Sequence, residues 1–152
     1  MDVVDDLLRS LGAAWDAGDG DAVAAHFTPG ADFVDVLGRL QQGRATIAAE
    51  HRDLFASIYA GSTCVFREIG RRELGCATLV HAASRLHVPA GPRRGDTHAT
   101  QTLLVENGLI SAFHNTVQAA MERFVGEESG FGSPEQAGVD DGPRDPRLPR
   151  PR

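Results

Sequence analysis

The sequence contains no lysine, so all fifteen of its basic residues are arginines. Acidic residues number 21, and the formal net charge is −6 at pH 7. A chain with this charge is a poor match for nucleic acid or an anionic membrane, because both are themselves negative. Alanine and glycine are abundant beside arginine. This pattern indicates a compositional bias, so the arginines alone do not predict phosphate binding.

Long hydrophobic runs are also missing from the sequence. No apolar stretch approaches the roughly 18 residues that a membrane-spanning helix needs. Residues 1–8 are acidic and lack the basic start and apolar run of a secretory signal peptide. We therefore expect a cytoplasmic protein that neither crosses a membrane nor binds to one.

Cysteine is scarce, and sequence motifs for metals and cofactors are missing. Cys64 and Cys76 lack metal-ligand spacing and are expected to stay reduced, although paired strands could still bring them into a disulfide. The six histidines match no zinc pattern. Asp19 and Asp21 are explained as helix caps, and the glycines beside them do not follow a strand as a dinucleotide-binding loop does. We expect neither a metal nor a cofactor.

The hydrophobic periodicity predicts an α+β domain. Apolar residues recur at spacings of three and four in two segments, which predicts amphipathic helices over residues 2–16 and 44–59. A short helix carrying Phe27 is expected between them. Extended segments are predicted over residues 31–37, 63–74, 76–88, 97–106 and 109 to about 124. Gly75 and Asn107–Gly108 mark tight hairpins, and Pro89–Asp96 a longer basic loop. Helices followed by such a meander favour helices packed on one face of an antiparallel sheet.

The composition changes after residue 125. Residues 126–152 are rich in glycine, proline, aspartate and arginine and contain few large apolar side chains. Such a segment buries too little surface to offset the entropy of ordering it. We expect a folded domain over residues 1–125 and a disordered tail over 126–152. The proline-rich end of this tail could also bind a partner as a polyproline II helix.

Two ionisable side chains lie within apolar patterns. Asp35 interrupts the run Phe33–Leu37, where a carboxylate costs free energy unless it is paired or neutral. It is either a general base with a raised pKa or a structural residue that accepts hydrogen bonds from the backbone or an arginine. His51 lies on the apolar stripe of its helix, as a core residue or as a pocket residue. A hydrogen bond between the two would form a carboxylate–imidazole pair.

Three segments resemble one protein superfamily: residues 17–38 (AGDGDAVAAHFTPGADFVDVLG), Gly43–His51, and Ser111–Thr116 (SAFHNT). Together with the order of elements, they are similar to the NTF2-like superfamily, which includes ketosteroid isomerase. More narrowly, they resemble the SnoaL-like, SgcJ/EcaC-type branch, some of whose members are accessory proteins of enediyne polyketide biosynthesis. The resemblance implies a cone-shaped, curved antiparallel sheet wrapped around the N-terminal helices, with a pocket at its wide end and a homodimer formed by the sheet.

The resemblance also assigns positions in the pocket. It places Asp35 on the general-base aspartate of ketosteroid isomerase, His51 on a tyrosine of its hydrogen-bond network and Gln101 on its oxyanion-hole aspartate. Leu11 stands at the oxyanion-hole tyrosine, whose hydroxyl it cannot replace. The resemblance therefore implies that the position of the general base is kept, whereas the oxyanion-hole positions that would bind the carbonyl oxygen are altered. Steroid isomerisation is therefore not expected.

Other side chains are expected to form the pocket wall. Strand alternation and the implied geometry direct Phe33, Phe113 and Asn115 into the cone. Trp15 would cover the wall with its apolar face. Simple helix–sheet packing of Trp15, and a polar pair of Asn115 with His114 on the sheet surface, are equally acceptable interpretations.

These features lead to two hypotheses about function. In the first, the protein binds an apolar oxygenated molecule, such as a polyketide intermediate, and catalyses cofactor-independent isomerisation, dehydration or cyclisation. Asp35 and His51 would be the catalytic residues, and Gln101 and Asn115 would polarise a carbonyl. In the second, it is a non-catalytic accessory protein that holds an intermediate or docks on a biosynthetic enzyme. The fold alone does not decide between them.

Overall fold

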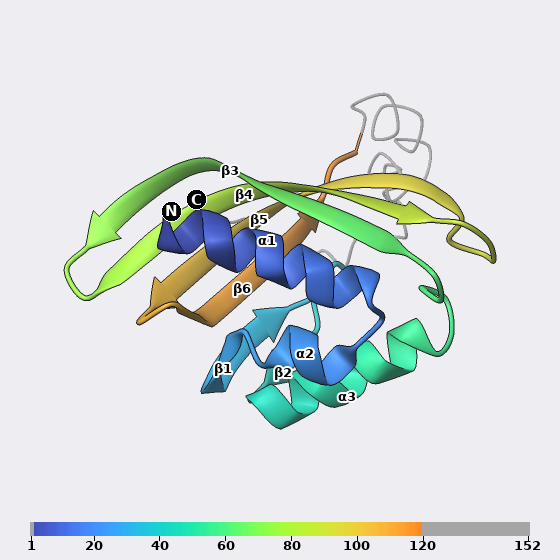
Figure 1. The fold of residues 1–152 in the computed structure, drawn as a ribbon, viewed down its shortest axis with the longest axis horizontal. Coiled ribbons are helices and arrows are strands. Elements are labelled where there is room, and N and C mark those ends of the chain that lie inside the picture. The colour runs from blue at the N-terminus through green and yellow to red at the C-terminus, as the bar shows by residue number, and fades with distance from the viewer. Residues whose placement is uncertain (1, 120–152) are drawn as a thin grey trace, which may run out of the picture. The chain divides into compact units, whose positions relative to one another are not determined.

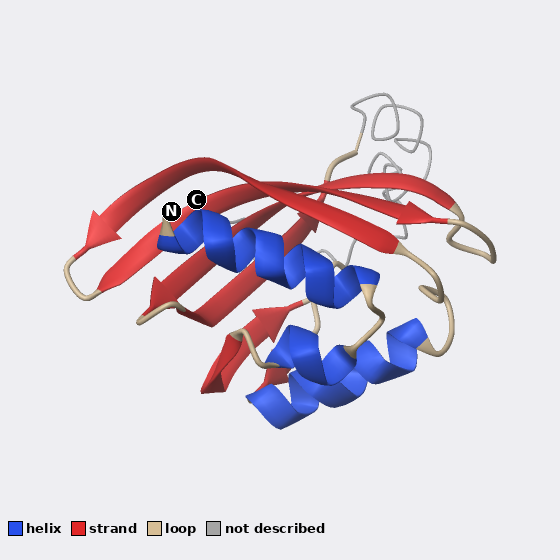
Figure 2. Cartoon of the chain, viewed as in Figure 1, coloured by secondary structure: helices blue, strands red, loops and turns tan. Residues whose placement is uncertain are grey.

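The computed structural model describes residues 2–119, which form three helices and one six-stranded sheet (Figures 1 and 2). The chain starts with two helices and two strands, followed by a third helix and four long strands. In order they are α1 (Val3–Asp16), α2 (Gly20–Ala24), β1 (Phe27–Val34), β2 (Leu40–Gln42), α3 (Arg44–Phe55), β3 (Thr63–Leu74), β4 (Ala77–Val88), β5 (Gly95–Glu106) and β6 (Leu109–Val117). The predicted α+β class, with N-terminal helices against a curved sheet, is confirmed.

Helix α1 forms where the sequence provides both a cap and an apolar stripe. The Asp2 carboxylate accepts a hydrogen bond from the Val4 backbone N–H at 2.8 Å, which satisfies a donor at the open helix end. The helix buries its apolar stripe in the core, and Gly12 permits its close approach to β3. A Cβ at Gly12 would lie 2.9 Å from the Cys64 carbonyl oxygen. This close packing fixes α1 across the sheet.

The sheet has the strand order β2-β1-β6-β5-β4-β3. All neighbouring strands are antiparallel except β1 and β6, which are parallel. The prediction of a purely antiparallel sheet is therefore wrong for one pair. Strand β1 lies outside the meander formed by β3 to β6. It joins the free edge of the last strand, so no hairpin fixes its direction.

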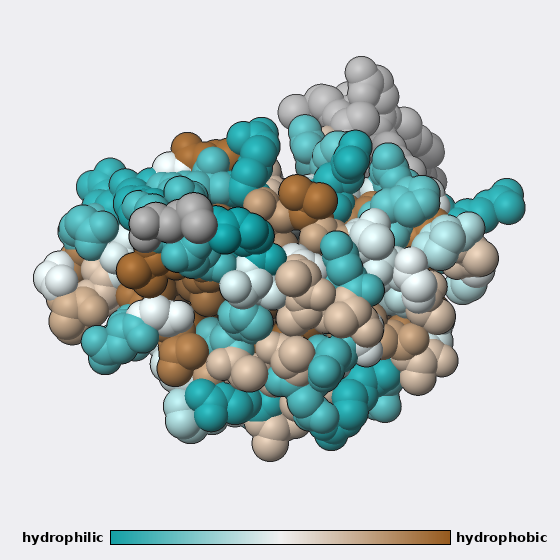
Figure 3. All heavy atoms as spheres, viewed as in Figure 1, coloured by the Kyte–Doolittle hydropathy of each residue, from teal (hydrophilic) through white to brown (hydrophobic). Residues whose placement is uncertain are grey.

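The helices cover one face of the sheet, as Figure 2 shows, and the core lies between the two layers. Fully buried core side chains come from the helices and from the inner face of the strands, among them Ile47, Val80, Leu103 and Ile110. The outer face carries exposed polar residues such as His81 and His114. In the view of Figure 3, hydrophilic residues alternate with small hydrophobic areas. Along each strand, buried side chains of the inner face alternate with exposed side chains of the outer face, as the two-residue period of a strand requires.

Several element ends differ from the predictions. Phe27 begins β1 and is not part of a helix, because α2 ends after five residues at Ala24. Helix α3 ends at Phe55, and turns follow as far as Gly61. Strand β2 was not predicted, because its three residues become a strand only by pairing with β1. Strand β6 ends at Val117, short of the predicted residue 124.

Both tight hairpins are confirmed. Asn107 and Gly108 have φ values of 49° and 75°, the positive pair that a type I′ turn requires. Gly75 has a φ of 73° and turns β3 into β4. The predicted tail over residues 126–152 lies outside the described residues. Within residues 2–119, no helix is long and apolar enough to cross a membrane.

Candidate functional site

A cavity of about 130 Å³ lies between the helices and the inner face of the sheet. Its wall is mostly apolar and comes from α1, α3, the β1–β2 turn and the long strands. Lining residues include Leu11, Trp15, Phe27, Phe33, Leu86 and Phe113. Trp15, Phe33 and Phe113, three of the expected pocket residues, lie on this wall.

Aromatic rings form a continuous wall around Trp15. The Trp15 ring lies 5.8 Å from His51, 4.9 Å from Phe55 and 5.8 Å from Tyr59, measured between ring centroids. Its indole Nε1–H donates a hydrogen bond to the Ser62 hydroxyl at 2.9 Å. This bond satisfies the polar end of the ring and holds its apolar face against the cavity.

Phe33, from β1, also packs against the imidazole. Its ring stacks on Phe113 with a centroid distance of 4.7 Å and an interplanar angle of 4°. The edge contact between Phe33 and His51 has a centroid distance of 5.3 Å and an angle of 90°. His51 therefore lies in an aromatic box that holds its ring in one orientation.

His51 is a neutral hydrogen-bonding group in this box. Its Nδ1 lies 2.8 Å from the Ile47 carbonyl oxygen, so Nδ1 carries the proton and donates it. The side chain is 3 % exposed, and burial lowers the pKa of His51 below its ordinary value of 6.5. Nε2, at the far end of the ring, is left with a lone pair and has no hydrogen-bond partner within residues 2–119.

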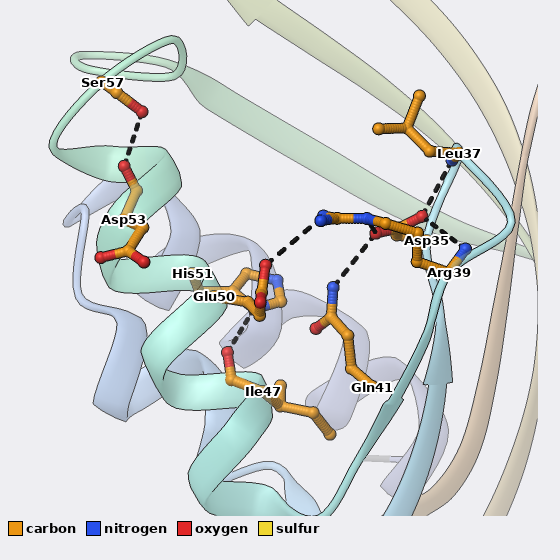
Figure 4. Close-up of polar contacts among 9 residues, drawn as sticks. All are labelled: Asp35, Leu37, Arg39, Gln41, Ile47, Glu50, His51, Asp53 and Ser57. Atoms are coloured by element: carbon orange, nitrogen blue, oxygen red, sulfur yellow. Dashed lines mark hydrogen bonds and ion pairs between the residues drawn. The ribbon is translucent and has the colours of Figure 1, made fainter.

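Asp35 occupies a different environment from the predicted one. It follows the end of β1 in a turn, where its carboxylate accepts hydrogen bonds from four donors (Figure 4). These are Leu37 N at 2.9 Å, Arg39 N at 3.0 Å, Arg39 Nε at 2.8 Å and Gln41 Nε2 at 3.3 Å. The structural interpretation, a carboxylate held by backbone and arginine, describes this geometry.

The pKa of Asp35 is lowered, not raised as the general-base interpretation expects. Partial burial alone would raise it, but the Arg39 and Leu37 N–H groups and the Arg39 guanidinium outweigh burial. The pKa therefore lies below its ordinary value of 3.8. Asp35 lines the cavity but makes no hydrogen bond to His51 in the described part of the chain. The two side chains therefore do not form a carboxylate–imidazole pair in this structure.

Arg39 connects the β1–β2 turn to α3. Its Nη2 lies 3.4 Å from a Glu50 carboxylate oxygen, while its Nε binds Asp35 (Figure 4). Two carboxylates thus share one guanidinium at the edge of the cavity. The charges at this edge of the cavity are therefore already matched.

A polar cluster lies on the inner sheet face. Gln101 is 1 % exposed, and its Nε2 donates to the Ser84 hydroxyl at 2.7 Å and to the Asn115 side-chain oxygen at 3.0 Å. Ser84 and Asn115 line the cavity, whereas Gln101 lies behind them. The Gln101 Oε1 is buried without a partner among the described residues. Gln101 therefore orients Asn115 from behind and does not line the pocket.

The sequence interpretation missed Ser84, Tyr59 and Arg93. Ser84 could have been found, because it breaks an apolar inward pattern between Ala82 and Leu86. Arg93 lies in the loop predicted to be basic, and its guanidinium carbon is 5.9 Å from the centroid of the Tyr59 ring. Ser84, Tyr59 and Arg93 all line the cavity. No local pattern distinguishes Arg93 from its neighbour Arg94.

The cysteines and metal sites can be assessed within residues 2–119. Cys64 is buried in β3, and burial raises the pKa of its thiol to about 12. Cys76 is exposed in the β3–β4 turn, and both thiols are free, so no disulfide forms between them. No group of three or more histidine, cysteine, aspartate or glutamate side chains in this part of the chain could hold a metal.

Comparison with known proteins identifies the family. The model of the SnoaL-like domain matches residues 8–113, more than half of the chain. The chain belongs to the SnoaL-like family. No curated protein matches this SnoaL-like chain at a significant level.

Solved structures share the fold of this SnoaL-like protein. A domain of unknown function with a cystatin-like fold from Nostoc punctiforme matches with a TM-score of 0.70 and 23% identity, over 83% of this chain and 82% of that one. A ketosteroid isomerase-like protein from Erwinia carotovora has a TM-score of 0.64 and 11% identity, over 78% and 95%. A protein with a ketosteroid isomerase-like fold from Catenulispora acidiphila, solved with trimethylamine, has a TM-score of 0.55 and 17% identity, over 72% and 82%.

Proposed function

We propose that this SnoaL-like protein binds a small, mainly apolar molecule with a carbonyl group and transfers a proton next to that carbonyl without a cofactor. The neutral His51, with a free Nε2 lone pair inside an aromatic cavity, is the observation that carries this proposal. An imidazole with a fixed tautomer is suited to accept a proton or a hydrogen bond from a ligand.

The size of the cavity limits the part of the ligand that enters it. At about 130 Å³, it is close to the ~150 Å³ cavity that is known to hold benzene in another protein. One ring, or an aliphatic group of similar bulk, fits the aromatic wall. The trimethylamine bound to the Catenulispora protein is an example of a small molecule held by this fold.

The proposed chemistry uses the two polar sides of the cavity. The proton leaves the carbon beside the carbonyl and binds to His51 Nε2, while the electron pair moves onto the carbonyl oxygen. Because Asn115 accepts from Gln101 through Oδ1, its Nδ2–H group is left to donate to that oxygen. Return of the proton from His51 Nε2 to another carbon completes an isomerisation. In a dehydration, the proton held by His51 passes to a hydroxyl on the carbon next to the deprotonated one, and this hydroxyl leaves as water while the enolate electron pair forms the new C=C bond.

The biological setting that we propose is natural-product biosynthesis in the cytoplasm, of the polyketide or enediyne type. This proposal rests on the resemblance of three segments, residues 17–38, 43–51 and 111–116, to accessory proteins of such pathways. Polyketide intermediates combine apolar bodies with acidic C–H groups beside carbonyls, which is the chemistry proposed for His51.

The exchange of deuterium into 2-indanone tests the proposed proton transfer. NMR in D₂O at pH 7 follows the protons beside the ketone with and without protein. We expect His51→Gln to lower the protein-dependent rate about 100-fold or more, since a positioned base contributes 10² to 10⁴. His26→Gln is the matched control and keeps the rate, because His26 bonds the carbonyl four residues earlier, as His51 does, but does not line the cavity.

Asp35 remains the competing prediction for the base. Because its carboxylate is already held by four donors, we expect Asp35→Asn to keep most of the exchange rate. Loss of exchange in Asp35→Asn with retention in His51→Gln would reverse our assignment. A thermal melt of each variant separates loss of chemistry from loss of fold.

A non-catalytic binding or accessory role is the second candidate. It is favoured by the pairing of the polar residues that line the cavity, since Asp35 is bound by Arg39, and Ser84 and Asn115 are both bound by Gln101 from behind the wall. Binding of 2-indanone without any acceleration of exchange would support this role, with a biosynthetic enzyme as the partner.

We further propose that the protein is a homodimer formed by the outer sheet face. Val65, on β3, is 61 % exposed, and β4, β5 and β6 add the exposed row His81, Thr102 and His114. Sedimentation equilibrium checks this proposal, and a monomer at micromolar concentration would contradict it.

A further inference from the structure

Two arginines line the cavity, and their charges are matched differently. Arg39 binds the carboxylates of Asp35 and Glu50. Arg93 has no carboxylate within ion-pair distance anywhere in residues 2–119. The charged residues that line the cavity are Asp35, Arg39 and Arg93. Among residues 2–119, Arg93 is the lining cation that has no carboxylate partner. This is notable in a chain whose net charge is −6.

The surroundings of Arg93 make an anion its natural partner. The side chain is half-buried, and its guanidinium carbon lies 5.9 Å from the centroid of the Tyr59 ring. A guanidinium over an aromatic ring uses its face for that contact and keeps the N–H groups at its edge free to donate. A partly desolvated cation without a partner is unfavourable, and a bidentate carboxylate would satisfy it.

Arg93 belongs to the same wall as His51. Tyr59 beneath Arg93 contacts Trp15, and Trp15 contacts His51. The two loops that carry Tyr59 and Arg93 are themselves packed together, since a Cβ at Gly61 would lie 3.4 Å from Pro89. An apolar ligand lying along Trp15 therefore reaches the imidazole at one end and the guanidinium at the other.

We propose that the ligand is a carboxylic acid, with its apolar body against Trp15 and its carboxylate bound by Arg93. This inference rests on the proposed function, because it assumes that the apolar cavity binds the body of the ligand. It adds the chemical class of the ligand and a residue that determines specificity. Neutral ketones and alcohols of the same shape would enter the cavity but leave Arg93 unmatched.

The experiment compares two probes that differ in charge. 3-Phenylpropionate and 3-phenylpropanol carry the same ring, and isothermal titration calorimetry at pH 7 gives their dissociation constants for the full chain. Trp15 is the single tryptophan, so its fluorescence provides a second measurement from inside the site. Arg93→Gln removes the proposed contact. Arg94→Gln is the matched control, because Arg94 is exposed and does not line the cavity.

We expect the acid to bind about tenfold or more tightly than the alcohol, a difference of about 1.4 kcal/mol. Arg93→Gln should remove this preference by weakening the acid alone, and Arg94→Gln should keep it. Added salt should weaken only the acid. Equal binding of both probes, or an unchanged preference in a folded Arg93→Gln, overturns the carboxylate proposal and leaves the apolar pocket standing. Failure of both probes to bind overturns the proposed function itself.

Discussion

The inner face of the sheet has two kinds of residue that lie close together in sequence. Val80, Leu103 and Ile110 are 0–1 % exposed and contact only the core. Leu86 and Val117, on the same face and on β4 and β6, line the cavity and are only partly covered. The first group packs the fold, and the second leaves space for a ligand. Stability and binding are therefore assigned to different positions of the same strands.

Two leucine-to-alanine substitutions test whether the core positions contribute more to stability than the positions of the cavity wall. Leu103→Ala should lower the free energy of unfolding by about 2–5 kcal/mol, because the site cannot collapse around the lost methyl groups. Leu86→Ala removes the same atoms from a wall that already faces open space, so we expect a clearly smaller loss. Urea denaturation measures both. Equal losses would show that the cavity wall is as important to stability as the core.

The sequence was sufficient for the packed part of the molecule. The apolar stripe of α1 and the two hairpin turns depend on neighbours in sequence, so periodicity and turn chemistry predicted them. The resemblance added the pocket and placed Trp15, Phe33 and Phe113 on it. Strand β2 and the parallel pairing of β1 could not be predicted, because both depend on partners distant in sequence.

The site was less predictable, because its electrostatics depend on contacts across the fold. Asp35 was expected in an apolar strand, but β1 ends one residue earlier and the turn supplies four donors. That one-residue shift replaces an apolar environment by backbone N–H groups and Arg39, which is the environment of the structural interpretation of Asp35. Within residues 2–119, Arg93 likewise has no carboxylate partner because of which residues are its neighbours in space, and no local sequence pattern shows this.

The same contrast between buried and exposed positions predicts how stability depends on pH. His51 has a lowered pKa when folded and an ordinary value near 6.5 when unfolded. Below about pH 6.5 the unfolded chain therefore binds a proton that the folded protein does not, and stability falls as the pH falls. The contribution to the slope is at most about 1.4 kcal/mol per pH unit.

Variants of two histidines isolate this contribution. Urea denaturation between pH 7.5 and 5 should show a flatter pH dependence for His51→Gln than for the wild type. His26→Gln is the control for replacing an imidazole elsewhere in the fold, because His26 does not line the cavity. An unchanged slope in His51→Gln would contradict a neutral, buried imidazole and would weaken His51 as the proton acceptor.

Asp35 should have the smallest effect on stability, because Arg39, its charged partner, is more than half exposed. The Arg39 side chain is 56 % exposed, and solvent screening limits such a pair to about 1 kcal/mol or less. The pKa of Asp35 is lowered, so its stabilisation is complete above its unfolded value of 3.8 and is lost as the pH falls through the folded value. Asp35→Asn should therefore cost little at pH 7, and the difference should vanish once the pH falls below the lowered folded pKa, where the wild-type carboxylate is itself protonated. A loss at pH 7 well above about 1 kcal/mol would mean that the β1–β2 turn organises the open end of the cavity. Asp35 would then belong both to the residues that stabilise the fold and to those that line the cavity.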